Sequence, residues 1–220
     1  MAEGVPQRPF RAPAGATEVI LVRHGASAVA FPDRPFPLVG GQSDPGLAPE
    51  GEAQAEALVD RLAAEPLAGL FVTPLRRTQQ TAAPLAARLG LEPVLVPELT
   101  EVRLGDFEGG EWRIRAANGD PLVARVFAEE RWDVIPNAEP MDDFARRVRT
   151  GIEKVVESAG ADAVVAAVSH GGVIAELCHQ ATGSRPFAFM FVDNASLTRL
   201  VVLPDGRWVL RSFNDTAHLD

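Results

Sequence analysis

Short apolar runs alternate with amphipathic helical segments along most of this 220-residue chain, and this alternation constrains its fold more than any other feature. A short apolar run bounded by glycine or proline is typical of a buried strand. Strands that alternate with helices favour a mostly parallel sheet with helices on both faces, so we expect a three-layer α/β/α sandwich. The predicted strands cover about 18–22, 70–72, 93–96 and 163–168, with 163–168 central, and the predicted helices cover about 49–64, 76–89 and 141–158, with a last one ending near Thr182.

The last part of the chain departs from this alternation. Two further strands are predicted at about 195–203 and 207–213, and Pro204-Asp205-Gly206 between them is typical of a hairpin turn. We therefore expect this pair to be antiparallel. Within the helix at 76–89, Pro84 is expected to produce a kink or to mark a restart, because proline removes a backbone donor.

The chain length favours one well-buried α/β domain rather than two. Residues 1–16 are rich in Pro, Gly, Ala and Arg, and we expect them to form a flexible N-terminal arm. Residues 17–220 then form a single domain. Within it, the irregular stretch at about 97–140, with helical pieces broken at Gly119-Asp120-Pro121, is expected to lie as a cap over one edge of the sheet.

Composition excludes several classes of function. The formal net charge is −9, whereas proteins that bind nucleic acid are usually basic. Cys178 is the only cysteine, so neither an intrachain disulfide nor a cysteine-based zinc site is expected. The sequence has no signal-like apolar region near its start and no apolar run of about 20 residues, so we expect a cytoplasmic protein that does not bind membranes. Two-fold symmetric homodimers are the commonest oligomers of soluble proteins, so a homodimer is the assembly that we expect.

Arginine, histidine and glutamate residues, which can bind anions or transfer protons, follow the predicted parallel strands at the point where each strand ends. Because the carboxyl ends of parallel strands meet at one edge of the sheet, these residues are expected to share one pocket. Arginines and histidines gathered in one pocket of an acidic protein predict a site for a dianion such as a phosphoryl group. Gly25 is expected to bring backbone N–H groups close to that anion. The segments concerned are Arg23-His24-Gly25, Thr73–Arg77, Glu98–Glu101 and Ser169–Gly172.

Charge suggests a role for each group. Neighbouring arginines disfavour the imidazolium form, so His24 is expected to be neutral and able to attack phosphorus. His170 can donate a hydrogen bond to phosphoryl oxygens, and a glutamate beside the leaving oxygen can protonate it. Glu101 and Glu98 are alternatives for that acid. The sequence has no HExxH, Walker lysine or paired-aspartate motif, so we expect no metal and no cofactor.

Five ordered motifs resemble those of the histidine phosphatase superfamily, also called the phosphoglycerate-mutase-like family, over about 17–219. The segment at 21–25 is similar to its RHG motif, and that at 73–82 to its S-P-L-x-R-A-x-Q-T-A motif. The segment at 98–109 is similar to its L-x-E…G-x-W-E-G motif, and that at 168–172 to its second-histidine motif. Gly41, Asp44, Leu47, Gly51 and Gln54 match the run that follows the RHG motif.

This resemblance implies a phosphohistidine intermediate on His24, with Arg77 rather than Arg76 as the phosphate-binding arginine and Glu101 as the proton donor. Ser27 could bind the phosphate or serve only a local turn. The catalytic residues implied are His24, Glu101, His170, Arg23 and Arg77, and the substrate-binding residues implied are Arg23, Ser27, Arg77, His170 and Gly171.

Two departures favour a phosphatase over a mutase. Position 26 is alanine, where many members have Glu or Gln, and the segment 28–31 lacks the Trp and Asn typical of mutases. We therefore expect a metal-independent phosphomonoesterase acting on a small phosphorylated metabolite. A cofactor-dependent mutase and a non-catalytic phospholigand-binding module are the alternatives. The cap contributes either a basic, aromatic lid or a solvated helix face, through Trp112, Arg113, Arg115, Phe127, Arg131 and Trp132.

Overall fold

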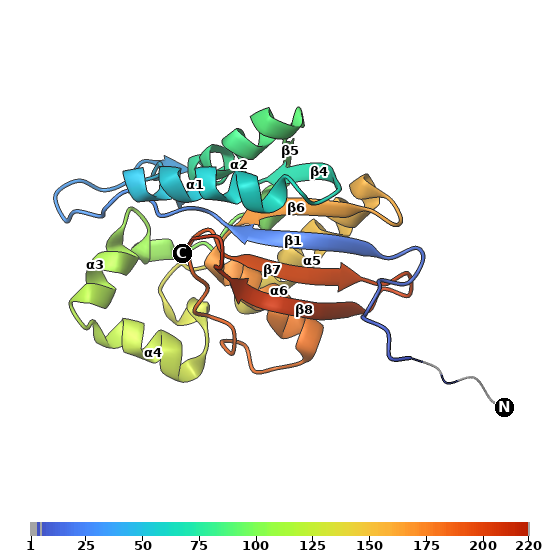
Figure 1. The fold of residues 1–220 in the computed structure, drawn as a ribbon. Helices are drawn as coiled ribbons and strands as arrows, with labels where there is room; N and C mark the ends of the chain where they lie inside the picture. Colours follow the sequence, from blue (N-terminus) through green and yellow to red (C-terminus); the bar gives the residue numbers. More distant parts are fainter. Residues whose placement is uncertain (1–3, 5, 220) are drawn as a thin grey trace.

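A six-stranded sheet forms the centre of the molecule (Figure 1). The structure is a computed structural model that describes residue 4 and residues 6–219. Part of the predicted flexible arm at 1–16, namely residues 1–3 and 5, lies outside the described residues. The strand order across the sheet is β5 (Val94–Leu95), β4 (Leu67–Val72), β6 (Val164–Ser169), β1 (Thr17–Arg23), β7 (Leu197–Val202) and β8 (Trp208–Asp215).

The sheet is parallel in one part and antiparallel in the other. Strands β5, β4, β6 and β1 pair in parallel, whereas β7 pairs antiparallel with both β1 and β8. The predicted parallel sheet, its C-terminal hairpin and the central place of β6 are confirmed. Register aligns the strand ends, because Arg23 pairs with Ser169 and Val72 pairs with Val168. The residues that follow β1, β4 and β6 therefore emerge side by side.

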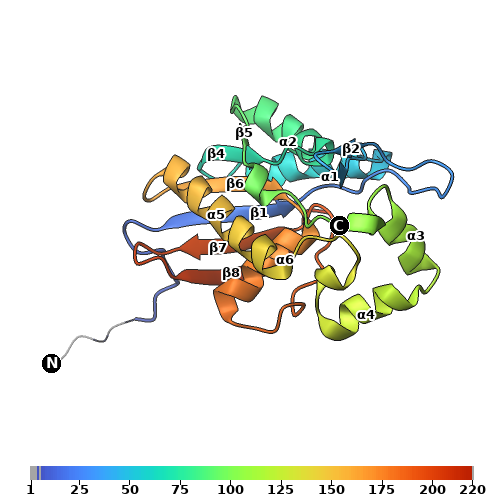
Figure 2. The ribbon, with the colours of Figure 1, turned by 180° about the vertical axis from the view of Figure 1, so that it is seen from behind.

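Helices cover both faces of this sheet. Helices α1 (Pro49–Leu62) and α2 (Arg76–Leu89) lie on one face, and α5 (Met141–Ala159) and α6 (Gly171–Thr182) lie on the other (Figures 1 and 2). Because side chains alternate along a strand, Ile20 and Val22 of β1 pack toward α1 and α2, whereas Val19 and Leu21 pack toward α5 and α6. All four of these β1 side chains are fully buried.

Helix α2 runs unbroken through Pro84, so the predicted restart at this residue is wrong. Proline removes a single backbone donor, and the buried side chains on both sides of it, Ala82 and Leu85, pack against the same core. This packing keeps the two halves of the segment in one helix. Gly90 ends the helix with φ +66°, and its N–H donates to the carbonyl of Ala86.

The stretch at 97–140 lies beyond the carboxyl edge of the parallel strands (Figure 1). Its helices are separated where the sequence predicted, since Gly119 has φ +68° and the Asp120 side chain caps the next helix by accepting from the Leu122 N–H. No helix among the described residues is both long and apolar enough to cross a membrane. The helices of this stretch are η1 (Pro97–Leu99), η2 (Gly105–Phe107), α3 (Glu111–Ala117), α4 (Pro121–Glu129) and η3 (Trp132–Val134).

The loop after β1 contains a small hairpin of two short strands. Strand β2 (Leu38–Val39) pairs antiparallel with β3 (Gln42–Ser43), and both intervening glycines have positive φ. Phe36, just before this hairpin, donates its N–H to the carbonyl of Gly109 at 2.9 Å. The hairpin thus joins the end of β1 to the segment that precedes α3.

Candidate active site

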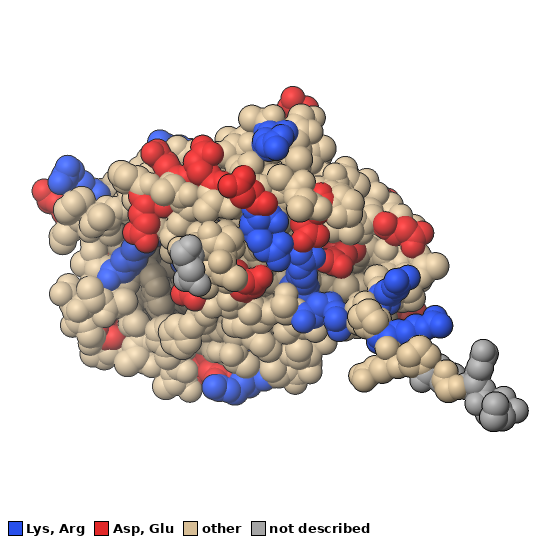
Figure 3. All heavy atoms as spheres, in the orientation of Figure 1, with Lys and Arg blue, Asp and Glu red and all other residues tan. Residues whose placement is uncertain are grey.

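A cavity of about 330 Å³ lies between the carboxyl edge of the sheet, the hairpin loop and the segments around α3. Figure 3 shows a hollow beside α3 with basic side chains at its edge, whereas acidic side chains gather over α1. Ionisable side chains form one part of the cavity wall and aromatic rings form another. The ionisable lining residues are Arg23, His24, Arg77, Glu101, Glu108 and Arg113, and the aromatic ones are Phe36, Phe107, Trp112 and Trp132.

The geometry around His24 fixes which ring nitrogen carries a lone pair. The Nε of Arg77 donates to His24 Nε2 at 3.1 Å, and arginine has no acceptor. His24 Nε2 is therefore unprotonated, and Nδ1 carries the hydrogen and donates it to the carbonyl of Gly25 at 2.8 Å. Burial, together with the charges of Arg77 and Arg23, lowers the pKa of His24 well below its ordinary value. The imidazole is consequently neutral at neutral pH.

Arg77 is the second residue of α2, and its side chain lines the cavity. Its guanidinium also donates to the carbonyl of Ser43 at 2.8 Å, which fixes its direction. Burial lowers the pKa of Arg77 to about 10, so it keeps its charge at neutral pH. The neighbouring Arg76 turns away and pairs with Asp44, because adjacent helical residues point about 100° apart.

Arg23 and His170 each have a buried nitrogen without a hydrogen-bond partner among the described residues. These atoms are Arg23 Nε and His170 Nδ1. Arg23 Nη1 donates to the carbonyl of Val192, whereas His170 Nε2 lies 3.0 Å from Thr73 Oγ1. Unpartnered buried polar atoms are rare in folded proteins. Of the two residues, only Arg23 lines the cavity, so an anion bound there would give Arg23 Nε an acceptor.

His170 lies behind His24 rather than in the cavity wall. The two rings meet edge to face with centroids 5.3 Å apart, and His170 is fully buried. Burial and the nearby charge of Arg77 lower the pKa of His170 well below its ordinary value. Both imidazoles are therefore neutral at neutral pH, as predicted for His24.

Glu101 lines the cavity, and its carboxyl group lies at the start of α6. Its Oε2 accepts from the Gly172 N–H at 3.1 Å, and its Oε1 accepts from the Val102 N–H at 3.0 Å. The rival acid, Glu98, is paired with Lys154 and does not line the cavity. The structure thus places only Glu101 of these two glutamates beside His24, Arg23 and Arg77.

The sequence profile of the histidine phosphatase superfamily (branch 1) matches residues 19–216. This match spans nearly the whole chain and includes every strand-end segment that lines the cavity. The chain belongs to the histidine phosphatase superfamily. The resemblance inferred from the motifs is confirmed.

Individual relatives agree with this assignment. The chain is 31% identical to the Yersinia enterocolitica protein named "Probable phosphoglycerate mutase GpmB", over 92% of this chain and 95% of that protein. It is also 31% identical to "Bifunctional protein Rv2228c" of Mycobacterium tuberculosis, over 92% of this chain but only 55% of that longer protein. Among solved structures, the mycobacterial glucosyl-3-phosphoglycerate phosphatase Rv2419c is 27% identical with a TM-score of 0.71, over 91% of this chain and 100% of that one.

Three predicted substrate-binding residues, Ser27, His170 and Gly171, do not line the cavity. The Ser27 hydroxyl accepts from Arg113 at 2.6 Å, because α3 brings that guanidinium against the loop after β1. Gly171 lies beside Arg23, since a Cβ added at Gly171 would be 3.4 Å from Arg23 Nε. Ser27 therefore contacts one arginine of the cavity wall, and Gly171 lies next to another.

The cap residues divide between the two predicted roles. Trp112, Arg113 and Trp132 line the cavity, as a basic and aromatic lid would. Arg115 and Arg131 instead pair with acidic neighbours away from it, as expected for a solvated face. Phe127 packs on Trp112 from outside, with ring centroids 6.1 Å apart. The cap thus presents aromatic walls and a single arginine to the cavity.

Gly25 has a different role from the one predicted. Its N–H donates to Thr81 Oγ1 at 2.9 Å, so it is not available to an anion. A Cβ at Gly25 would lie 2.5 Å from the carbonyl oxygen of Gly51, at the start of α1. The next residue, Ala26, donates its N–H to Gln54 Oε1 at 2.8 Å. Glycine is required at position 25 because the loop after β1 passes so close to the backbone of α1 at Gly51 that a side chain would not fit.

Two residues outside the predicted catalytic and substrate-binding set join the walls of the cavity. Glu108 accepts from the N–H of Leu104 at 2.8 Å and the N–H of Ser43 at 2.7 Å, and so joins the hairpin to the cap. Gln42 lines the cavity and donates to the carbonyl of Glu101. These contacts lie between irregular segments, which carry no periodic signal.

We also searched residue 4 and residues 6–219 for a metal site. Among them, no group of three or more His, Cys, Asp or Glu side chains lies close enough together to hold a metal ion.

Proposed function

We propose that this chain is a metal-independent phosphomonoesterase that hydrolyses a small phosphorylated metabolite through a phosphohistidine intermediate on His24. The observation that carries this proposal is the His24 Nε2 lone pair, held toward a cavity by a charged arginine. A neutral imidazole is a nucleophile, and arginines stabilise the charge on transferring phosphoryl oxygens. The family membership supports the same chemistry.

In the first step, the substrate phosphate takes the place beside Arg77 and Arg23, and its oxygens accept hydrogen bonds from both guanidinium groups. Arg77 Nε shifts its hydrogen bond from His24 Nε2 to a phosphoryl oxygen, which frees the lone pair of Nε2. His24 Nε2 attacks phosphorus, a P–N bond forms, and the P–O bond to the organic group breaks in line with it. Glu101, entering the step protonated, gives its proton to the leaving oxygen. The products of this step are the alcohol and phospho-His24.

In the second step, water replaces the alcohol beside Glu101. The Glu101 carboxylate takes a proton from this water, whose oxygen attacks phosphorus while the P–N bond breaks. Inorganic phosphate leaves, His24 Nε2 regains its lone pair, and Glu101 is protonated again. The proton and the electron pairs thus return to their starting places, so the enzyme needs no other reactant.

A mutase that returns the phosphoryl group to a second hydroxyl is the alternative, since one relative carries a phosphoglycerate mutase name. The phosphatase is favoured by Ala26 and by the segment 28–31, which departs from the mutase pattern. The glucosyl-3-phosphoglycerate phosphatase among its structural relatives also supports hydrolysis. Release of phosphate without any isomerised product would exclude the mutase.

Trapping of the intermediate tests the mechanism. Substrate carrying labelled phosphate is mixed with enzyme, quenched at alkaline pH to preserve phosphohistidine, and the protein is assayed for label. Label is expected in the wild-type protein and in His179→Ala, whose histidine lies outside the cavity, but not in His24→Ala. Label that persists in His24→Ala would refute the mechanism.

Turnover of an aryl phosphate by the wild-type protein would exclude the non-catalytic phospholigand-binding module.

A further inference from the structure

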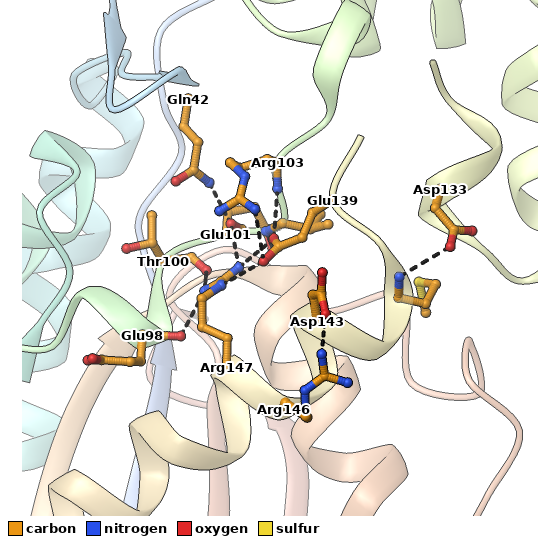
Figure 4. Close-up of polar contacts among 12 residues, drawn as sticks. Gln42, Glu98, Thr100, Glu101, Arg103, Asp133, Glu139, Asp143, Arg146 and Arg147 are labelled. Atoms are coloured by element: carbon orange, nitrogen blue, oxygen red, sulfur yellow. Dashed lines mark hydrogen bonds and ion pairs between the residues drawn. The ribbon is translucent and has the colours of Figure 1, made fainter. Parts of the chain in front are cut away.

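Glu101 lies in an irregular segment, so neither a helix nor a strand fixes its position. The segment 98–103 begins in η1, continues as irregular backbone through the first part of the cap, and η1 packs against α5. Figure 4 shows Arg147 rising from α5 toward this segment, with the labelled side chains of Gln42 and Glu139 close to it. A proton donor must be held within hydrogen-bond reach of the leaving oxygen, so something must fix this segment.

Arg147 donates to three backbone carbonyls of the segment. Its Nη1 donates to the carbonyls of Glu98 and Thr100, each at 2.7 Å, and its Nη2 donates to the carbonyl of Glu101 at 3.2 Å. Gln42 Nε2 donates to the same Glu101 carbonyl from the hairpin. The backbone that carries the carboxyl group is therefore held from α5 and from the cavity wall.

Glu139 fixes the direction of Arg147. The pair is bidentate, with Nε at 2.8 Å from Oε1 and Nη2 at 2.7 Å from Oε2. The Glu139 side chain is only 1% exposed, so this ion pair is screened little by solvent. Glu139 also donates its N–H to the carbonyl of Arg103 at 2.9 Å and accepts from the Arg103 N–H at 3.3 Å. Both ends of the segment are therefore joined to one ion pair, whose carboxylate is buried.

The preceding arginine of α5 shows that this arrangement is specific. Arg146 is exposed and pairs with Asp143 on its own helix, and it reaches no part of the segment (Figure 4). Arg147 itself does not line the cavity, so it does not reach a substrate there. We propose that Arg147, fixed by Glu139, is a positioning residue that sets the place of the Glu101 carboxyl group for proton transfer.

This role rests on the proposed function, in which Glu101 protonates the leaving oxygen. Displacing a general acid slows substrates whose leaving group needs a proton and spares those whose leaving group departs as an anion. Loss of Arg147 therefore lowers the rate constant of the first step, in which the organic group leaves, far more for an alkyl phosphate than for p-nitrophenyl phosphate. The second step, in which Glu101 acts as the base, is slowed equally for both. The affinity for substrate changes little, because the phosphate is bound by Arg23 and Arg77, which line the cavity, whereas Arg147 does not.

The experiment compares Arg147→Lys with the matched control Arg146→Lys on both substrates. Lysine keeps the charge but has one ammonium group, which cannot reach Glu139 and three carbonyls together. For Arg147→Lys, the first-step rate constant in single-turnover measurements is expected to fall about 30-fold on the alkyl phosphate and less than about 3-fold on the aryl phosphate. Arg146→Lys is expected to match the wild-type protein on both substrates. Equal losses on the two substrates would overturn the role of Arg147.

A second comparison separates this role from the proposed acid itself. Glu101→Gln alone is expected to show the selective loss, and adding Arg147→Lys to it is expected to add no further selective loss. A selective loss in Glu101→Gln with none in Arg147→Lys overturns only the positioning role. A uniform loss in Glu101→Gln refutes the acid and the positioning role together.

Folding is controlled with a double variant. Replacing both members of a buried ion pair by apolar residues of similar size often preserves stability. If Arg147→Lys does not accumulate in folded form, Arg147→Met with Glu139→Leu is tested in its place; it removes the contacts of Arg147 together with the ion pair between Arg103 and Glu139. The same selective loss of the first-step rate constant is expected from it, and equal losses on the two substrates would contradict the proposal.

Discussion

Gly172 and Glu101 lie so close together that no other residue fits at position 172 without moving the carboxyl group. The Gly172 N–H donates to Glu101 Oε2 at 3.1 Å, and a Cβ added at Gly172 would lie 2.5 Å from Glu101 Oε1. Real Cβ atoms do not approach an oxygen so closely, because their van der Waals shells overlap. The atom that must move is the end of a flexible side chain, so activity is affected more than folding.

Gly172→Ala is therefore expected to lower kcat by about 10-fold or more on an alkyl phosphate, as expected for a displaced general acid. Its free energy of unfolding is expected to change by less than about 1 kcal/mol, since alanine favours a helix. Steady-state kinetics and urea unfolding measure the two effects. Gly171→Ala is the neighbouring comparison, because its Cβ would make only an ordinary 3.4 Å contact with Arg23 Nε. Equal kcat values for the two variants would contradict this account.

Gly25→Ala is expected to have the opposite effect, with a large loss of stability. The added Cβ would lie 2.5 Å from the carbonyl oxygen of Gly51, which belongs to the backbone of α1 and cannot turn aside. Overpacking of this kind costs about 1–3 kcal/mol. Urea unfolding monitored by tryptophan fluorescence measures the loss. A variant with an unchanged unfolding midpoint would show that α1 shifts freely relative to the end of β1.

Arg113→Ala is expected to weaken substrate binding. Arg113 lines the cavity, and its guanidinium is oriented by the Ser27 hydroxyl and by the carbonyl of Ala28. We expect a rise in KM of about 10-fold for a substrate with a second anionic group, which corresponds to about 1.4 kcal/mol. Arg125→Ala is the matched control, because Arg125 is exposed and pairs with Glu129 away from the cavity. An unchanged KM for such substrates would contradict the prediction.

Acid is expected to destabilise the protein through His24 and His170. In the folded protein the pKa of each is held well below 6.5, chiefly by burial. When the pH falls below about 6.5, the unfolded chain binds protons that the folded protein does not, so the free energy of unfolding falls by up to about 1.4 kcal/mol per pH unit for each histidine. Above this pH both states are neutral and the contribution is constant.

Urea unfolding at roughly pH 5.5 and pH 7.5 measures this dependence. His170→Asn is expected to have a smaller difference in unfolding free energy between the two pH values than the wild-type protein, because one of the two buried imidazoles is gone. A difference equal to that of the wild-type protein would show that His170 accepts a proton in the folded state.

The sequence predicted the sheet well because its signals are periodic. The apolar runs at 18–22 and 163–168 became the two central strands, and the helix at 76–89 has its observed bounds. The helix does not restart at Pro84, one of the two alternatives predicted, because a single missing hydrogen bond is outweighed by the packing of Ala82 and Leu85 on either side of it. Tertiary packing overrides a local preference of this size.

Side-chain direction was predictable only where the backbone is regular. Arg76 and Arg77 lie in a helix, so facing one of them into the cavity requires the other to point away. Ser27 lies in a loop, where no period fixes its direction. Its hydroxyl accepts from Arg113, a residue 86 positions away, and no local pattern in the sequence indicates that contact.

By itself, the sequence determined that His24, Arg77 and His170 meet. Parallel strands end at one edge of a sheet, and the residues that follow them are placed there by connectivity alone. Only the tertiary structure decided how Glu101 is held and which residue holds it. Glu101 depends on Arg147 and Glu139, which reach it across irregular backbone, and on Gly172, which leaves it room. Such contacts depend on distances between segments far apart in the chain, and only the packed fold sets those distances.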